Sequence, residues 1–219
     1  TLSYLSKDGE EGFPGNLEIQ VTYTLGEDNA IAMDYVAKTD QATVLNICNH
    51  SYFNLTGNVK RDVLDHSIQL NAPFFIPVDK VLIPTGEVKS VKGGPFDFTS
   101  PKKIGQEINA SEEQIAIGGG YDHCYAFDKA PGAYGKIARV EEPSSGRVME
   151  VFTTEPGVQF YTGNNLDGHL VGKYGTKYIK RSGFCLETQH YPDSPNKANF
   201  PSTVLRPGET YTSKTVYQF

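Results

Sequence analysis

Apolar and polar residues alternate along much of the chain. From residue 17 to residue 23 every second side chain is apolar, and the same period returns from residue 31 to residue 37. This is the spacing of a strand with one buried face. Residues 26–29, between the two runs, are Gly, Glu, Asp and Asn, which favour a turn. The pattern therefore predicts a β-hairpin.

Similar segments recur about every ten residues, with turn-forming residues between them. Further strands are predicted at residues 43–48, 67–70, 122–127, 136–140, 148–154, 159–162, 183–188 and 211–219, with a second hairpin loop at 141–146. The 22 glycines and 13 prolines punctuate these segments, as in sandwiches and barrels. We expect an all-β fold, formed by residues 1–219 as a single domain.

One short helix is predicted after Ser100. Ser100 can cap a helix, Pro101 suits a first turn, and Ile104 and Ile108 are spaced by one helical turn.

Composition and charge exclude several classes of protein. The net charge is -6 and no basic block is present, which argues against a nucleic-acid partner. No apolar run approaches the roughly 20 residues that cross a bilayer, so no membrane partner is expected. Cys48, Cys124 and Cys185 lie beside apolar or aromatic residues and are interpreted as reduced core thiols of a cytoplasmic protein.

Common cofactor and metal motifs are absent from the sequence. It contains no GxGxxG after a strand, no GxxxxGK[ST] loop, no CxxC and no HExxH. The glycines at 118–120 precede a predicted strand, so they lack the helix N-terminus that binds phosphate.

His50 lies where a predicted strand ends, in the segment Asn-His-Ser-Tyr-Phe-Asn-Leu-Thr-Gly at 49–57. Beside Tyr52 and Phe53 its ring could be partly desolvated and still reach a cleft. An imidazole can donate or accept a proton near neutral pH. A histidine is more often structural than catalytic, so both interpretations stay open here. His66 lies in a charged stretch and is interpreted as part of a solvated turn.

Glu187 follows an apolar run in Gly-Phe-Cys-Leu-Glu-Thr-Gln at 183–189. Alternation places it on the same side as Cys185, away from solvent, where burial would raise its pKa toward that of a useful base. The alternative is an exposed glutamate on a polar face. Asp122 follows the glycines, and its neighbour His123 should point to the opposite face of a strand. Gln159 lies among aromatic residues and could bind a polar ligand; the alternative is an ordinary strand residue that faces water. Carboxylate, imidazole, amide and aromatic groups together suit a carbohydrate.

These segments, in this order, resemble the aldose 1-epimerase family. The matching segments are residues 8–15, 49–57, 76–87, 121–123, 159–164, 183–189 and 205–209. The resemblance spans essentially all 219 residues.

The resemblance implies a large antiparallel β-sandwich that interconverts the α and β anomers of aldoses such as galactose and glucose, with no cofactor and no metal. By motif match, Glu187 is the general base for the anomeric hydroxyl and His50 is the general acid for the ring oxygen. Asp122 and Gln159 match positions that hold the sugar hydroxyls. The ring opens to the aldehyde and recloses on the other carbonyl face.

The front of the chain departs from the family pattern. Family members carry an earlier segment with an Arg-containing motif and a His-Gly-Gly motif, and neither motif occurs here. We therefore expect the chain to be the C-terminal portion of the full domain. One hypothesis is that the N-terminal segment is a separate chain that stays associated as a partner.

Two other functions are compatible with the same residues. One is a non-catalytic sugar-binding module of the same fold. The other is a glycosidase that uses Asp122 and Glu187 as its carboxylate pair.

Overall fold

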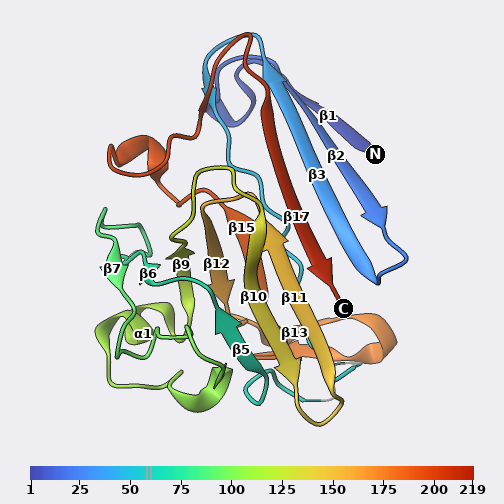
Figure 1. The fold of residues 1–219 in the computed structure, drawn as a ribbon, viewed down its shortest axis with the longest axis vertical. Helices are drawn as coiled ribbons and strands as arrows, with labels where there is room; N and C mark the ends of the chain where they lie inside the picture. The colour runs from blue at the N-terminus through green and yellow to red at the C-terminus, as the bar shows by residue number, and fades with distance from the viewer. Residues whose placement is uncertain (58, 60) are drawn as a thin grey trace.

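The computed structural model describes residues 1–57, 59 and 61–219, and most of its regular structure is β-strand. The larger sheet contains, in spatial order, β1 (Leu2–Ser6), β2 (Leu17–Leu25), β3 (Ala30–Thr39), β17 (Tyr211–Gln218), β11 (Arg147–Thr153), β10 (Gly135–Glu142), β5 (Ser67–Leu70) and β8 (Lys102–Lys103). Figure 1 shows the C-terminal strand β17 inside this sheet, between β3 and β11.

A second, smaller sheet carries the residues of most interest. Its order is β15 (Cys185–Gln189), β12 (Gly157–Tyr161), β9 (Asp122–Ala126), β6 (Phe74–Phe75) and β7 (Lys89–Ser90). Two further pairs are formed by β13 (Asp167–Val171) with β14 (Lys177–Ile179) and by β4 (Thr43–Val44) with β16 (Val204–Leu205). All of these strand pairings are antiparallel. The all-β antiparallel prediction is confirmed.

Both predicted hairpins are present. Strands β2 and β3 pair from Leu17–Thr39 to Leu25–Ile31. Strands β10 and β11 are joined by residues 143–146, within the predicted loop, and there the Glu142 carboxylate accepts hydrogen bonds from the amides of Ser144 and Ser145. The predicted strand at 43–48 is shorter, because only Thr43–Val44 pairs with β16. Beyond it the side chain of Asn46, instead of its backbone, bonds the main chain of His190.

The helix predicted after Ser100 is wrong. Residues 104–106 form a single 3-10 turn after β8. The Ile104 amide donates to the His66 carbonyl, and the Gly105 amide donates to the Leu64 carbonyl, so the backbone bonds a neighbouring segment and not itself. The α-helix α1 lies later, at Glu113–Gly118, and begins where the Glu112 carboxylate accepts two amide hydrogen bonds. A helix that short carries too little periodicity for the sequence to reveal it.

His66 is also not where the sequence placed it. Its side chain is fully buried, and its Nε2 accepts a hydrogen bond of 3.0 Å from the Leu55 amide. Burial lowers the pKa of this imidazole, which fits a neutral acceptor in the core. The charged neighbours of His66 in the sequence suggested an exposed turn, although the His66 side chain itself faces inward.

The largest cluster of buried side chains takes members from both sheets. Val140 and Val151 come from the larger sheet, and Phe160 and Leu186 come from the smaller one. All four are fully buried. This shared core holds the smaller sheet against the larger one. Among the helices of the described residues, none is long and apolar enough to cross a membrane.

Shortening one core side chain tests this packing. Ile68 is fully buried on β5, so Ile68→Val should lower the free energy of unfolding by about 0.5–1.5 kcal/mol through a small void. Ile179 on β14 is 56% exposed, and Ile179→Val should stay within about 0.5 kcal/mol of the parent. Urea unfolding of both variants measures the difference. Equal losses would contradict this description of the core.

Candidate active site

Four polar residues that the sequence analysis singled out line one open pocket on the smaller sheet. They are His50, Asp122, Gln159 and Glu187, and the cavity has a volume of about 310 Å³. Two aromatic rings and two amides complete the lining: Tyr52, Tyr161, Asn165 and Gln189. The structure therefore brings all four singled-out residues together.

Strand pairing explains how these side chains meet. Gln159 on β12 lies directly opposite Glu187 on β15, and neighbouring strands place opposing side chains on the same face. Because side chains alternate between faces, Tyr161 and Gln189 share the pocket face, two residues further along each strand. The same period of two, counted from Gln159 and Glu187, could have found these two residues in the sequence.

The imidazole of His50 and the carboxylate of Glu187 form the centre of the pocket. His50 Nε2 lies 3.5 Å from Glu187 Oε1, and the two side chains are 51% and 10% exposed respectively. The His50 ring stacks on Tyr52, with centroids 5.2 Å apart and planes at 17°. A solvent-accessible imidazole thus lies beside a buried carboxylate.

The surroundings of Glu187 make it easier to protonate. Burial raises its pKa, and the neighbouring Asp122 carboxylate raises it further. The positive charge of His50 and the Cys48 thiol, whose Sγ lies 3.6 Å from Oε2, act in the opposite direction. Burial prevails. The side chain faces away from bulk solvent, as alternation indicated.

Asp122 and Gln159 form a second polar pair in the pocket. The Gln159 Nε2 donates to the Asp122 Oδ1 over 2.9 Å, and burial raises the pKa of Asp122. The Gln159 Oε1 is buried and has no hydrogen-bond partner among the described residues. An unpaired buried acceptor is costly, so this oxygen is suited to accept a hydrogen bond from a ligand hydroxyl. His123 points to the other face, where it is fully buried, as predicted.

One group of possible metal donors occurs in the described part of the chain. Ligand atoms of His50, Cys185 and Glu187 all lie within 4.8 Å of one another. A thiol binds metal as the thiolate, and burial raises the pKa of Cys185 well above its usual range. A metal bound here would therefore have to displace a proton from the Cys185 thiol. All three cysteines are free of disulfide bonds.

Known proteins with similar sequences belong to one family. A model of the aldose 1-epimerase family matches residues 1–218. The chain is 47% identical to galactose mutarotase from Homo sapiens over 218 residues, which covers 100% of the chain and 62% of that protein. It is 41% identical to aldose 1-epimerase from Escherichia coli (strain K12) over 217 residues, covering 98% of the chain and 62% of that protein.

Solved structures show the same fold. The crystal structure of the GalM/aldose epimerase homologue from C. elegans superposes with a TM-score of 0.85 at 28% identity, over 99% of this chain and 63% of that one. Galactose 1-epimerase from Lactobacillus acidophilus NCFM gives 0.85 at 26% identity, over 99% and 61%. The chain thus spans about three fifths of the length of these relatives. Because the family model matches almost every residue, the chain belongs to the aldose 1-epimerase family.

Proposed function

We propose that this protein interconverts the α and β anomers of aldoses such as galactose and glucose. The observation that carries the proposal is the approach of His50 Nε2 to Glu187 Oε1, at 3.5 Å, in an open pocket. In a cyclic sugar the anomeric hydroxyl and the ring oxygen are bonded to the same carbon. An acid and a base that act on those two oxygens must therefore lie close together, as these two side chains do.

Ring opening needs two proton transfers, and reclosure reverses both. Glu187 takes the proton of the anomeric hydroxyl, and the electron pair of that O–H bond forms the carbonyl. The bond from C1 to the ring oxygen breaks, and the ring oxygen takes the proton of His50. Rotation about C1–C2 presents the other carbonyl face. Reclosure returns each proton to its donor and produces the opposite anomer.

Other residues of the pocket hold the sugar. Asp122 and the free Oε1 of Gln159 accept hydrogen bonds from sugar hydroxyls. Tyr52 and Tyr161 offer aromatic surface for the apolar side of the ring. Both rings border His50, with centroids at 5.2 and 6.4 Å from the imidazole, so a sugar that contacts them lies beside the acid.

Polarimetry of freshly dissolved α-galactose tests the proposal. Because the chain spans 62% of the curated relatives' length, the assay uses the complete gene product. Optical rotation should reach equilibrium faster with the protein than in buffer alone. A buffer rate together with calorimetric binding of galactose would favour the non-catalytic binding module. Release of sugar from a galactoside would favour the glycosidase.

The dependence of kcat/KM on pH should report the state of Glu187. The base works only when deprotonated, so activity should rise with pH as the carboxyl loses its proton. Since the pKa of Glu187 is raised by burial, the midpoint of this acidic limb should lie above the ordinary glutamate range.

Removing the Cys48 thiol should shift the acidic limb of the pH profile to higher pH. The Cys48 thiol lowers the pKa of Glu187 through its contact with Oε2, so Cys48→Ala should shift the midpoint to higher pH. Ser51→Ala, at an exposed position nearby, should leave it unchanged. A shift to lower pH in Cys48→Ala would exclude Glu187 as the group that titrates.

We also propose a cytoplasmic location for the protein. Three unbonded thiols support it, because free thiols are typical of reducing compartments.

A further inference from the structure

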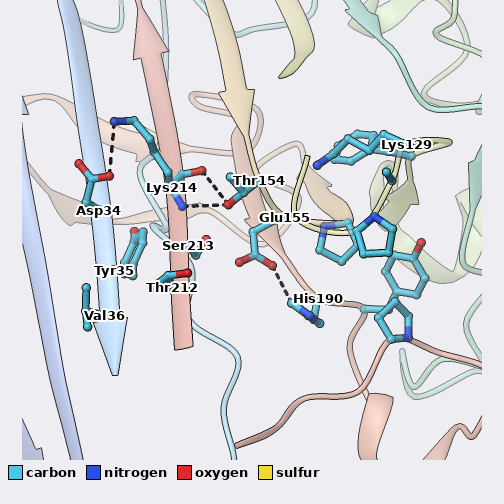
Figure 2. Close-up of a pocket in the computed structure, with 17 residues that line it drawn as sticks. Asp34, Tyr35, Val36, Lys129, Thr154, Glu155, His190, Thr212, Ser213 and Lys214 are labelled. Atoms are coloured by element: carbon cyan, nitrogen blue, oxygen red, sulfur yellow. Dashed lines mark hydrogen bonds and ion pairs between the residues drawn. The ribbon is translucent and has the colours of Figure 1, made fainter. Parts of the chain in front are cut away.

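A hydrogen-bonded histidine and glutamate lie just beyond the end of the candidate active site. His190 Nδ1 lies 2.7 Å from Glu155 Oε2, and the side chains are 24% and 3% exposed. Figure 2 shows this pair inside a second cavity of about 460 Å³, between β17 on one side and the loop that carries Lys129 on the other. Neither residue lines the candidate active site. His190 directly follows Gln189, which does line it.

The Glu155 carboxylate is held as a charged group. Its Oε1 accepts a hydrogen bond of 2.9 Å from the Tyr211 hydroxyl. Burial alone would raise its pKa, but hydrogen bonds from His190, Ser213 and Tyr211, together with the charge of His190, hold the pKa below its usual value. A buried carboxylate with this many partners is held firmly in place, because each partner compensates part of its buried charge.

His190 also binds a third segment through its backbone. The Asn46 side chain donates to the His190 carbonyl and accepts from the His190 amide, both at 3.0 Å. Glu155, His190 and Asn46 therefore form one connected unit, here named the bracket. It joins the start of β12, the end of β15 and the loop that follows β4.

Each of the three residues of the bracket is close in sequence to a residue of the candidate active site. Gln159 lies four residues after Glu155, Glu187 lies three residues before His190, and His50 lies four residues after Asn46. Pairing of β12 with β15 already fixes Gln159 against Glu187. His50 lies outside any strand, since its segment leaves the β4–β16 pairing after Val44. The part after His50 is held by the antiparallel bridge between Phe53 and Phe184, and Asn46 is an anchor on the part before it.

We propose that Glu155 and His190 are positioning residues, which set the distance between the acid His50 and the base Glu187 through Asn46. Misplacement of reacting groups by about 1 Å can cost about 10²-fold in rate. The bracket acts on that distance from outside the pocket. This inference rests on the proposed function, and its test includes a measurement that does not depend on sugar chemistry.

The first test is Glu155→Gln in the complete gene product. Glutamine keeps an acceptor for Tyr211 but removes the charge that holds His190. We expect kcat for mutarotation to fall by about 10- to 100-fold, with KM changed less than about twofold. The shape of the pH profile should stay the same, because Glu155 itself transfers no proton. Loss of one limb of the profile would overturn the inference and make Glu155 a proton-transfer group.

A matched control carries the same change elsewhere. Glu150 on β11 pairs with Lys136 at 3.0 Å on the surface of the larger sheet. Glu150→Gln should leave kcat within about twofold of the parent, since exposed ion pairs contribute little. A similar fall in kcat in both variants would overturn the inference.

The second measurement is hydrogen exchange of two bonded backbone amides that flank His50: Leu45, which donates to the Thr203 carbonyl, and Phe53, which donates to the Phe184 carbonyl. Exchange of these two amides should accelerate in Glu155→Gln and not in Glu150→Gln. Unchanged exchange and parental kcat in a folded Glu155→Gln protein would overturn the inference. Faster exchange in a protein that shows no mutarotation even in its parent form would instead leave the bracket intact and reject the proposed function.

Asn46→Ala provides a second route if Glu155→Gln does not fold. Asn46 is exposed, so its truncation threatens the core less, yet it removes both hydrogen bonds to His190. The same result is expected: a lower kcat, a nearly constant KM and faster exchange of the Leu45 and Phe53 amides. A parental kcat in this variant would overturn the inference.

Discussion

Replacement of Glu187 with glutamine should slow mutarotation of galactose by about 10²- to 10⁴-fold, the usual contribution of a positioned proton-transfer group. Glutamine has nearly the same shape as glutamate, but its amide cannot accept the proton of the anomeric hydroxyl. Polarimetry at several galactose concentrations separates kcat from KM. The loss should fall mainly on kcat, because the group acts in the transition state.

Loss of activity through unfolding must be separated from loss of the base. Glu187→Gln removes a charge whose burial is unfavourable, as its raised pKa indicates, so thermal unfolding should show no destabilisation. Glu18→Gln on the exposed side of β2 is the matched control and should keep the parental rate. A Glu187→Gln protein with the parental kcat would reject the proposed base.

His50→Asn should produce a loss of similar size, about 10²- to 10⁴-fold in kcat. Asparagine can still donate a hydrogen bond, but it cannot release a proton to the ring oxygen. The His50 side chain is about half exposed, so the substitution should have little effect on the free energy of unfolding, which urea titration measures.

Combining the two substitutions gives a sharper test. Groups that act as a pair in one step show strongly non-additive losses. The double variant should therefore be little slower than the slower single variant. Full multiplication of the two losses would mean that the residues act in separate steps, and a His50→Asn protein with the parental rate would exclude His50 as the acid.

Much of the fold could be predicted from the sequence, because the dominant signal was local. A strand with one buried face shows its period of two over a few residues, and both hairpins carry turn residues between such runs. The prediction failed where contacts with residues distant in the sequence determine the local structure. Residues 102–106 pair with β5 and bond the segment before it, and nothing in their own spacing shows this.

The candidate site could be predicted from the sequence only in part. Alternation placed Glu187 away from solvent and His123 on the face opposite Asp122, and resemblance supplied the roles, which stay predictions. The Cys48 contact with Glu187 and the Glu155–His190 hydrogen bond could not be foreseen, because they join positions 139 and 35 residues apart. The single-domain interpretation also stays a prediction, supported by a core cluster that runs from Met33 to Tyr217.

The pairing of β12 with β15 has a consequence for how the site is acquired. A shift of β15 by one residue would exchange its two faces, placing Leu186 and Thr188 in the pocket and Glu187 against Phe160 and Val158. An ionised carboxylate in that core would be uncompensated and strongly unfavourable. The same burial energies that exclude the misaligned sheet therefore select the arrangement with the Glu187 carboxylate in the pocket. A molecule that folds stably is, for this reason, also one whose proposed proton acceptor is already in place.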